Sequence, residues 1–204
     1  MLMVPDTATT VVRASHVPGP EQGHWTYEAY MQLPEAEGFR YEIIEGVLYM
    51  APAPGPYHER VVISLGARLF TAIEDTGLGQ VFASPDIVIG PFTLRPDAVV
   101  VLNARLGVVA EKRLVGAPDL VVEIASPSTA AYDRNPVDGK RGAYARMGIP
   151  EYWIVDPVER SVELFTLEGD AYRSVGIFSG TAPLTSPLLP GLNLLAHQLF
   201  PRPA

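Results

Sequence analysis

Two short apolar runs constrain the fold of this chain more than any other feature of its sequence. Residues 98–102 read Ala-Val-Val-Val-Leu, and residues 120–125 read Leu-Val-Val-Glu-Ile-Ala. Runs of this length, rich in valine, are typical of central strands that are covered on both faces. Each run also carries an acid, because Asp97 opens the first run after a proline and Glu123 lies inside the second.

The acid inside the second run is the more unusual of the two. Removing an unpaired carboxylate from water costs several kcal/mol even after the surrounding structure relaxes. Glu123 therefore needs a partner, which can be a cationic side chain, a metal ion or a group of hydrogen-bond donors. A hard divalent ion held by carboxylates would also activate water.

The composition excludes several classes of protein. The 204 residues include no cysteine, which excludes disulfides and thiolate metal sites. The formal charge of −8 argues against a protein that coats nucleic acid, but it does not exclude an enzyme that acts on it. No apolar run approaches the ~20 residues of a membrane span, and no signal peptide is recognised. We expect a cytoplasmic protein with no membrane partner, consisting of a loose tail over residues 1–24 and one domain over residues 25–204.

Hydrophobic periodicity and turn residues predict an α/β fold. The predicted core elements are, in chain order, a helix over residues 57–75, strands over 79–89 (broken near Ser84 and Pro85), 97–102 and 120–125, a helix over 136–147 and a strand over 151–156. Tight turns predict additional hairpins near both ends of the domain, over residues 41–50 and 161–178. This order indicates a mixed sheet with helices on its faces.

Strand geometry decides which acids can bind a single ion. Asp119 and Glu123 share a strand face, but they are four positions apart, which separates them by ~13 Å. Asp97 can approach Glu123 if their strands are neighbours, because adjacent strands lie ~4.8 Å apart. Lys140 is in phase with the apolar positions of the second predicted helix, so its side chain should start on the inward side. A site for Mg²⁺ or Mn²⁺ at Asp97 and Glu123, with Lys140 near it, is the resulting hypothesis.

Four segments carry a family resemblance. They are residues 41–46, 95–97, 117–129 and 148–157, of which the last two are the most specific. Together with Lys140, they resemble the PD-(D/E)XK nuclease superfamily and, within it, the Uma family of restriction endonucleases.

The resemblance implies a restriction-endonuclease-like mixed sheet and an endonuclease that hydrolyses DNA with Mg²⁺ or Mn²⁺. The implied metal ligands are the carboxylates of Asp97 and Glu123 and the carbonyl of Ile124. The superfamily has a lysine two residues after the glutamate, where this chain has Ala125. Lys140, from the following helix, is the expected replacement.

Two further residues are candidates for the catalytic site. Glu45 matches a position in the family motif, and His58 lies one helical turn before Val61 on the inward face of the first predicted helix. Either could bind a second metal ion, transfer a proton or order the metal ligands. Many nucleases of this type act as homodimers, so a homodimer is also expected.

Two other interpretations fit the same residues. The absence of the motif lysine at Ala125 is compatible with a nuclease-like fold that binds nucleic acid or a protein without cleaving it. An internal ion pair would satisfy Glu123 as well as a metal ion does, as in a purely structural or interaction module.

Overall fold

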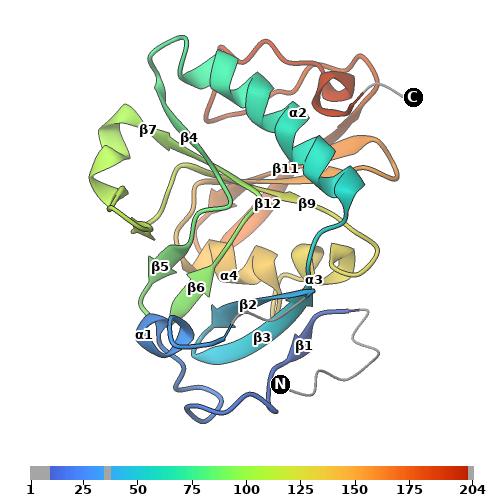
Figure 1. Cartoon of the computed structure of the whole chain (residues 1–204). Coiled ribbons are helices and arrows are strands. Elements are labelled where there is room, and N and C mark those ends of the chain that lie inside the picture. Colours follow the sequence, from blue (N-terminus) through green and yellow to red (C-terminus); the bar gives the residue numbers. More distant parts are fainter. Residues whose placement is uncertain (1–9, 35–37, 202–204) are drawn as a thin grey trace.

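Two six-stranded sheets organise the chain in the computed structural model, which describes residues 10–34 and 38–201 (Figure 1). The N-terminal sheet contains, in spatial order, β1 (Val12–Arg13), β3 (Val47–Pro52), β2 (Phe39–Ile44), β6 (Phe92–Leu94), β5 (Ile87–Ile89) and β8 (Leu114–Val115). The central sheet contains β12 (Ala171–Ser179), β11 (Ser161–Glu168), β10 (Glu151–Asp156), β9 (Leu120–Ile124), β7 (Ala98–Leu102) and β4 (Gly79–Ala83). The helices are α1 (Tyr27–Tyr30), α2 (Pro56–Ile73), α3 (Ala130–Arg134) and α4 (Lys140–Arg146), with the 3-10 helices η1 (Asn103–Val108) and η2 (Ala196–Leu199).

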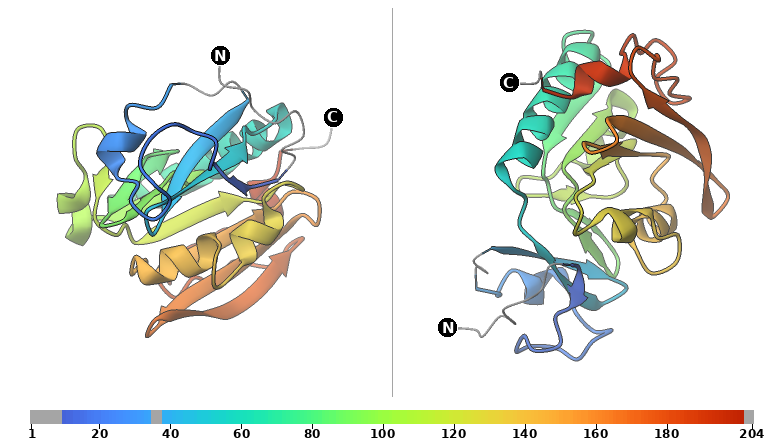
Figure 2. Two further views of the ribbon diagram at one scale, coloured as in Figure 1. Left: turned by 90° about the horizontal axis from the view of Figure 1, so that it is seen from below. Right: turned by 90° about the vertical axis from the view of Figure 1, so that its right-hand side faces the viewer.

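The central sheet is covered on both faces, as the two valine-rich runs predict. One face packs against the buried stripe of α2, formed by Val61, Leu65, Leu69 and Ile73, and against the C-terminal segment. Figure 2 shows η2 beside α2 on this side. The other face packs against α4 and against side chains of the N-terminal sheet. The predicted mixed α/β sheet flanked by helices is therefore confirmed.

The predicted break in the strand over residues 79–89 is confirmed, and one predicted helix differs from the structure in its bounds. The strand divides at Ser84, whose φ is 48°, into β4 of the central sheet and β5 of the N-terminal sheet. The second predicted helix begins at Lys140 instead of Pro136. The side chain of Asn135 accepts hydrogen bonds from the backbone N–H groups of Val137 (2.8 Å) and Asp138 (3.1 Å), and such a local turn competes with helix formation. The separate short helix α3 precedes this turn.

The N-terminal segment is more ordered than the sequence predicts. The predicted loose tail does not hold for residues 10–24, because β1 pairs with β3, and Ala14 and Val17 are buried against the N-terminal sheet. Residues 1–9 lie outside the described part of the chain. This packing could not be predicted from the sequence, because it depends on a few isolated apolar residues that form no periodic pattern.

Both predicted hairpins are present. Glu45 (φ 51°) and Gly46 (φ 72°) form the turn between β2 and β3, as expected of a two-residue turn with positive φ at both central positions. β11 and β12 form the hairpin at the C-terminal edge of the central sheet. Across the described residues, no helix has the length and apolar character to cross a bilayer.

Candidate active site

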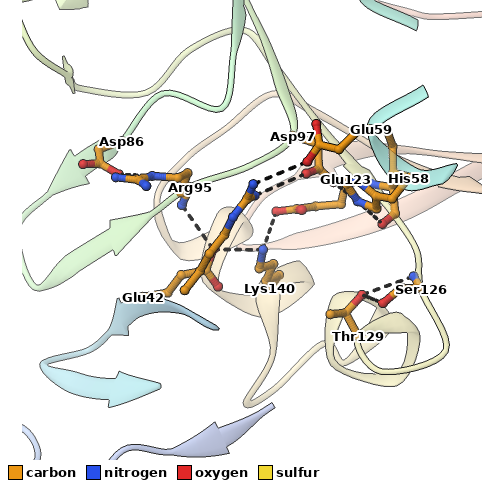
Figure 3. Close-up of polar contacts among 12 residues, drawn as sticks. Glu42, His58, Glu59, Asp86, Arg95, Asp97, Glu123, Ser126, Thr129 and Lys140 are labelled. Carbon is orange, nitrogen blue, oxygen red and sulfur yellow. Dashed lines mark hydrogen bonds and ion pairs between the residues drawn. The ribbon is translucent and has the colours of Figure 1, made fainter. Parts of the chain in front are cut away.

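A pocket of about 130 Å³ lies where the two sheets and the start of α2 meet. Its wall includes side chains from both sheets, from α2 and from the segment around α3 and α4 (Figure 3). The titratable and cationic residues that line it are Arg40, Glu42, His58, Arg95, Asp97, Glu123, Asp133 and Lys140.

Asp97 and Glu123 lie on neighbouring strands, as the sequence predicts. β7 and β9 are antiparallel with Ala98 opposite Val122, so Asp97 precedes β7 at the position facing Glu123. The backbone N–H of Ile124 donates a hydrogen bond of 2.8 Å to Asp97 Oδ2. Both acids are buried, at 5% and 4% exposure, and both line the pocket. The antiparallel register therefore places Asp97 and Glu123, which are 26 positions apart in the sequence, opposite each other.

Lys140 is the cation that pairs with Glu123 and with a further acid, Glu42. As the first residue of α4, it directs Nζ to within 2.8 Å of Glu123 Oε1 and 2.9 Å of Glu42 Oε1 (Figure 3). Tyr144, one turn further along α4, donates a hydrogen bond of 2.5 Å to Glu123 Oε1. Burial lowers the pKa of Lys140, but the charges of Glu123 and Glu42 outweigh it and raise the pKa well above its usual value. The ammonium form is therefore held at neutral pH.

Glu42, from β2, is a pocket residue that the sequence analysis missed. Its Oε1 contacts Lys140 and accepts a hydrogen bond of 3.2 Å from the backbone N–H of Arg95, while its Oε2 is buried with no hydrogen-bond partner. Glu42 could have been found by the argument used for Glu123, since it too is an acid within an apolar strand. The structure places the predicted Glu45 elsewhere, in the β2–β3 turn, where it is half exposed and lies 2.9 Å from Arg146 Nε.

His58 reaches the pocket from the first turn of α2, on the predicted inward side. Its Nε2 lies 3.1 Å from Asp97 Oδ2 and 3.1 Å from the carbonyl oxygen of Ile124, and its Nδ1 is buried without a partner. Burial lowers the pKa of His58, but the hydrogen bond and charge of Asp97 turn the net shift upward. The imidazole thus contacts two of the three predicted metal ligands.

Asp133 is a second acid whose position the sequence did not predict. It lies in α3 at 1% exposure and lines the pocket. Burial raises its pKa to about 6, against the opposing effect of the Lys140 charge. Its Oδ1 has no hydrogen-bond partner. The pocket therefore contains two buried carboxylate oxygens, Glu42 Oε2 and Asp133 Oδ1, that have no hydrogen-bond partner among the described residues.

Carboxylate oxygens in a buried pocket fit a hard cation. In the parts of the chain that the structure describes, no three acidic or histidine side chains gather closely enough to bind one ion. The three residues that the sequence analysis names as metal ligands, Asp97, Glu123 and Ile124, all line the pocket. Their carboxylate and carbonyl oxygens are of the kind that suits Mg²⁺ and Mn²⁺.

The other Pro-Asp acids serve the fold. Asp119 accepts a hydrogen bond of 2.8 Å from the backbone N–H of Leu102 and lies 3.0 Å from Arg105 Nε. Asp86 accepts a hydrogen bond of 2.8 Å from Arg95 Nε. Neither lines the pocket. Of the three described aspartates that follow a proline, the structure therefore brings only Asp97 to Glu123.

The architecture is that of a restriction-endonuclease-like α/β protein. A solved structure with this fold is "a putative nuclease belonging to DUF820" from Anabaena variabilis ATCC 29413, with a TM-score of 0.69 and 21% identity, covering 89% of this chain and 98% of that one. The model of the Uma2 family, described as "Putative restriction endonuclease", matches residues 27–197. The chain therefore belongs to the Uma2 family, which confirms the resemblance seen in its motifs. No curated protein matches the chain significantly.

Proposed function

We propose that this protein is a metal-dependent endonuclease that hydrolyses phosphodiester bonds of DNA. The observation that supports this function most directly is the pairing of Asp97 with Glu123 across β7 and β9, with Lys140 Nζ 2.8 Å from Glu123 Oε1. Membership of the Uma2 family supports a nuclease independently of that geometry.

In this proposal, Asp97, Glu123 and the Ile124 carbonyl would hold Mg²⁺ or Mn²⁺. When bound, the ion would polarise the scissile phosphate and lower the pKa of a water molecule. The carboxylates are pre-positioned for this task, since Asp97 is fixed by the Ile124 N–H and Glu123 by Tyr144. A fixed ligand set avoids reorganisation during the reaction.

Lys140 would orient the attacking water and stabilise the negative charge that develops on the phosphate. Its side chain is suited to this role because two carboxylates hold the ammonium in one place. Glu42 would act through Lys140 as a positioning residue. His58 would order Asp97 and the Ile124 carbonyl and could carry a proton at Nε2, and we assign no step to Glu45, which lies outside the pocket.

Cleavage of plasmid DNA in the presence of Mn²⁺ or Mg²⁺ tests this function. Asp97→Asn and Glu123→Gln are expected to abolish cleavage, because each removes a charged metal ligand without changing side-chain size. Asp119→Asn is the matched control, since Asp119 also follows a proline and is equally buried at 5%, but lies outside the pocket. Wild-type cleavage rates in both ligand variants would refute the proposal.

A second candidate is a nuclease-like module that binds nucleic acid or a protein without cleaving it. The observation that favours it is that Lys140 is fully engaged by Glu42 and Glu123, while position 125, the usual place of the lysine, is alanine. Calorimetric titration with MnCl₂ separates the two candidates. Metal binding that is lost in Asp97→Asn supports the nuclease, whereas DNA binding that needs no metal and produces no cleavage supports the module. The expected homodimer and the cytoplasmic location stay predictions.

A further inference from the structure

A second and larger cavity adjoins the pocket that contains Asp97 and Glu123, which we call the catalytic pocket. Its volume is about 440 Å³, and its wall includes Tyr30, Met31, Phe39, Arg40, Tyr41 and Arg95. We call this cavity the aromatic pocket. It lies along the edge of β2, where β6 pairs only through Thr93 with Ile43 in the described chain. The edge of β2 from Phe39 to Tyr41 is therefore without a strand partner on that side among the described residues.

Two arginines connect the aromatic pocket to the catalytic pocket, because Arg40 and Arg95 line both. Arg95 is fixed in place by Asp86 and by a hydrogen bond of 3.0 Å from its Nη2 to the hydroxyl of Tyr30. Its backbone N–H reaches Glu42 in the catalytic pocket. The two cavities are therefore neighbours with Arg40 and Arg95 in both walls, so one extended ligand could reach both by passing these arginines.

Arg40 is the least engaged cation on this path. Its guanidinium nitrogens lie 4.0 Å from Asp97 Oδ1 and 3.7 Å from Glu59 Oε1, both longer than a hydrogen bond. A guanidinium held only loosely by protein carboxylates can bind a phosphate in two-pronged geometry without breaking a strong internal contact. Arg40 is therefore placed to bind a phosphate between the two cavities.

The sizes and chemistry of the cavities indicate what each can hold. The catalytic pocket, at about 130 Å³, is smaller than the ~300–1,000 Å³ typical of sites for small organic ligands, whereas the aromatic pocket falls within that range. Aromatic rings and guanidinium planes are the groups on which proteins stack unpaired nucleobases. A base that is paired in a duplex cannot enter such a cavity, because both of its faces are stacked against neighbours.

We propose that the aromatic pocket binds an unpaired nucleobase of the substrate, next to the phosphate that enters the catalytic pocket, with Arg40 on the connecting phosphate. This inference rests on the proposed nuclease function and extends it to the substrate class. The protein then acts on DNA in which a nucleotide beside the cleavage point is unpaired or extruded.

Binding to a short duplex with one central unpaired thymidine tests this inference. The comparison probe is the same duplex with an abasic residue at the bulge, which keeps the backbone distortion and removes only the base. Fluorescence anisotropy is measured in EDTA, so that the DNA stays intact. The base is expected to strengthen binding roughly 5- to 150-fold, which is the range that stacking of one base gives.

Matched variants connect the effect to the cavity. Phe39→Leu should reduce the difference between the thymidine and the abasic probe, whereas Phe70→Leu, which changes an exposed ring on α2 outside the aromatic pocket, should leave it unchanged. Equal affinity for the two probes, or an equal effect of the two variants, would overturn the inference about the aromatic pocket. The proposal of metal-dependent cleavage would still stand. Base-dependent binding by a protein that cleaves nothing would instead refute the proposed function and retain the aromatic pocket as a nucleobase site.

Discussion

The ammonium of Lys140 lies 2.8 Å from Glu123 Oε1 although 17 residues separate them in the sequence. Lys140 begins α4, and Glu123 lies in β9, so the pair joins a helix to the central sheet. A superfamily lysine placed two residues after the glutamate would follow β9 directly, at the position of the buried Ala125. In the proposed function, Lys140 supplies this charge from α4 instead.

Lys140→Met should abolish cleavage and destabilise the fold. Removing one partner of a buried ion pair leaves uncompensated charge and costs ~3–5 kcal/mol. Here the substitution leaves Glu123 and Glu42 without their cation. Urea denaturation measures the loss in the free energy of unfolding. Lys112→Met, at an exposed site, serves as the control and should change stability by less than ~0.5 kcal/mol.

Glu42→Gln and Glu45→Gln should behave differently. Glu42→Gln is expected to lower the cleavage rate roughly 10- to 100-fold, because it weakens the electrostatic hold on Lys140, as is typical of residues that support a catalytic group. Glu45→Gln should leave the rate close to that of the wild type, since Glu45 pairs with Arg146 outside the pocket. Initial rates at saturating Mn²⁺ provide the measurement. A larger effect for Glu45→Gln would restore the role predicted from the family motif.

Asp133 should make folding stability depend on pH. Its pKa is raised from 3.8 to about 6, mainly by burial, with Glu42 and Asp97 raising it and Lys140 lowering it. The folded state therefore binds a proton more tightly than the unfolded state, and stability is expected to fall as the pH rises from about 4 to about 6. This proton contributes about 3 kcal/mol to the change in the free energy of unfolding across the range, and Asp133→Asn should remove that contribution. Chemical denaturation across this range measures it, and an unchanged slope in the variant would contradict the assignment.

Replacing either of two helical glycines with alanine should change the stability of the protein, but in opposite directions. A Cβ on Gly142 in α4 would lie 2.4 Å from the backbone oxygen of Pro136, so Gly142→Ala should displace α4 and cost about 1–3 kcal/mol. A Cβ on Gly66 in α2 meets nothing within 4 Å. Gly66→Ala should therefore stabilise the protein by about 1 kcal/mol through helix propensity. Because Lys140 begins the displaced helix, only Gly142→Ala should also reduce cleavage.

The sequence predicted the elements that depend on regular periodicity. The valine-rich strands, the stripe of α2 and the inward direction of Lys140 follow from repeated apolar positions, and they determined the pairing of Asp97 with Glu123. Glu45 was named as a candidate because it matches a position in the family motif, and Glu42 was overlooked. The hairpin itself was predicted correctly, with Glu42 in its first strand and Glu45 in its turn. The motif match, and not the local structure, was therefore misleading.

The burial of Asp133 depended on tertiary packing and left no local signal. It follows from the short helix α3, which a local Asn135 turn separates from α4. The packing of residues 10–24 depends on contacts with strands far along the chain, including the pairing of Val12 with Met50. Such long-range contacts carry no periodic pattern, so a tail and an edge strand look alike in the sequence.

Glu42 belongs to the N-terminal sheet and Glu123 to the central sheet, and Lys140 lies between them. Lys140 therefore connects the two sheets, and neither sheet alone supplies all the charged groups of the proposed mechanism. A shift of one sheet relative to the other would separate the ammonium from one of its acids. If the proposed function holds, mild denaturation should therefore abolish cleavage before it unfolds the chain.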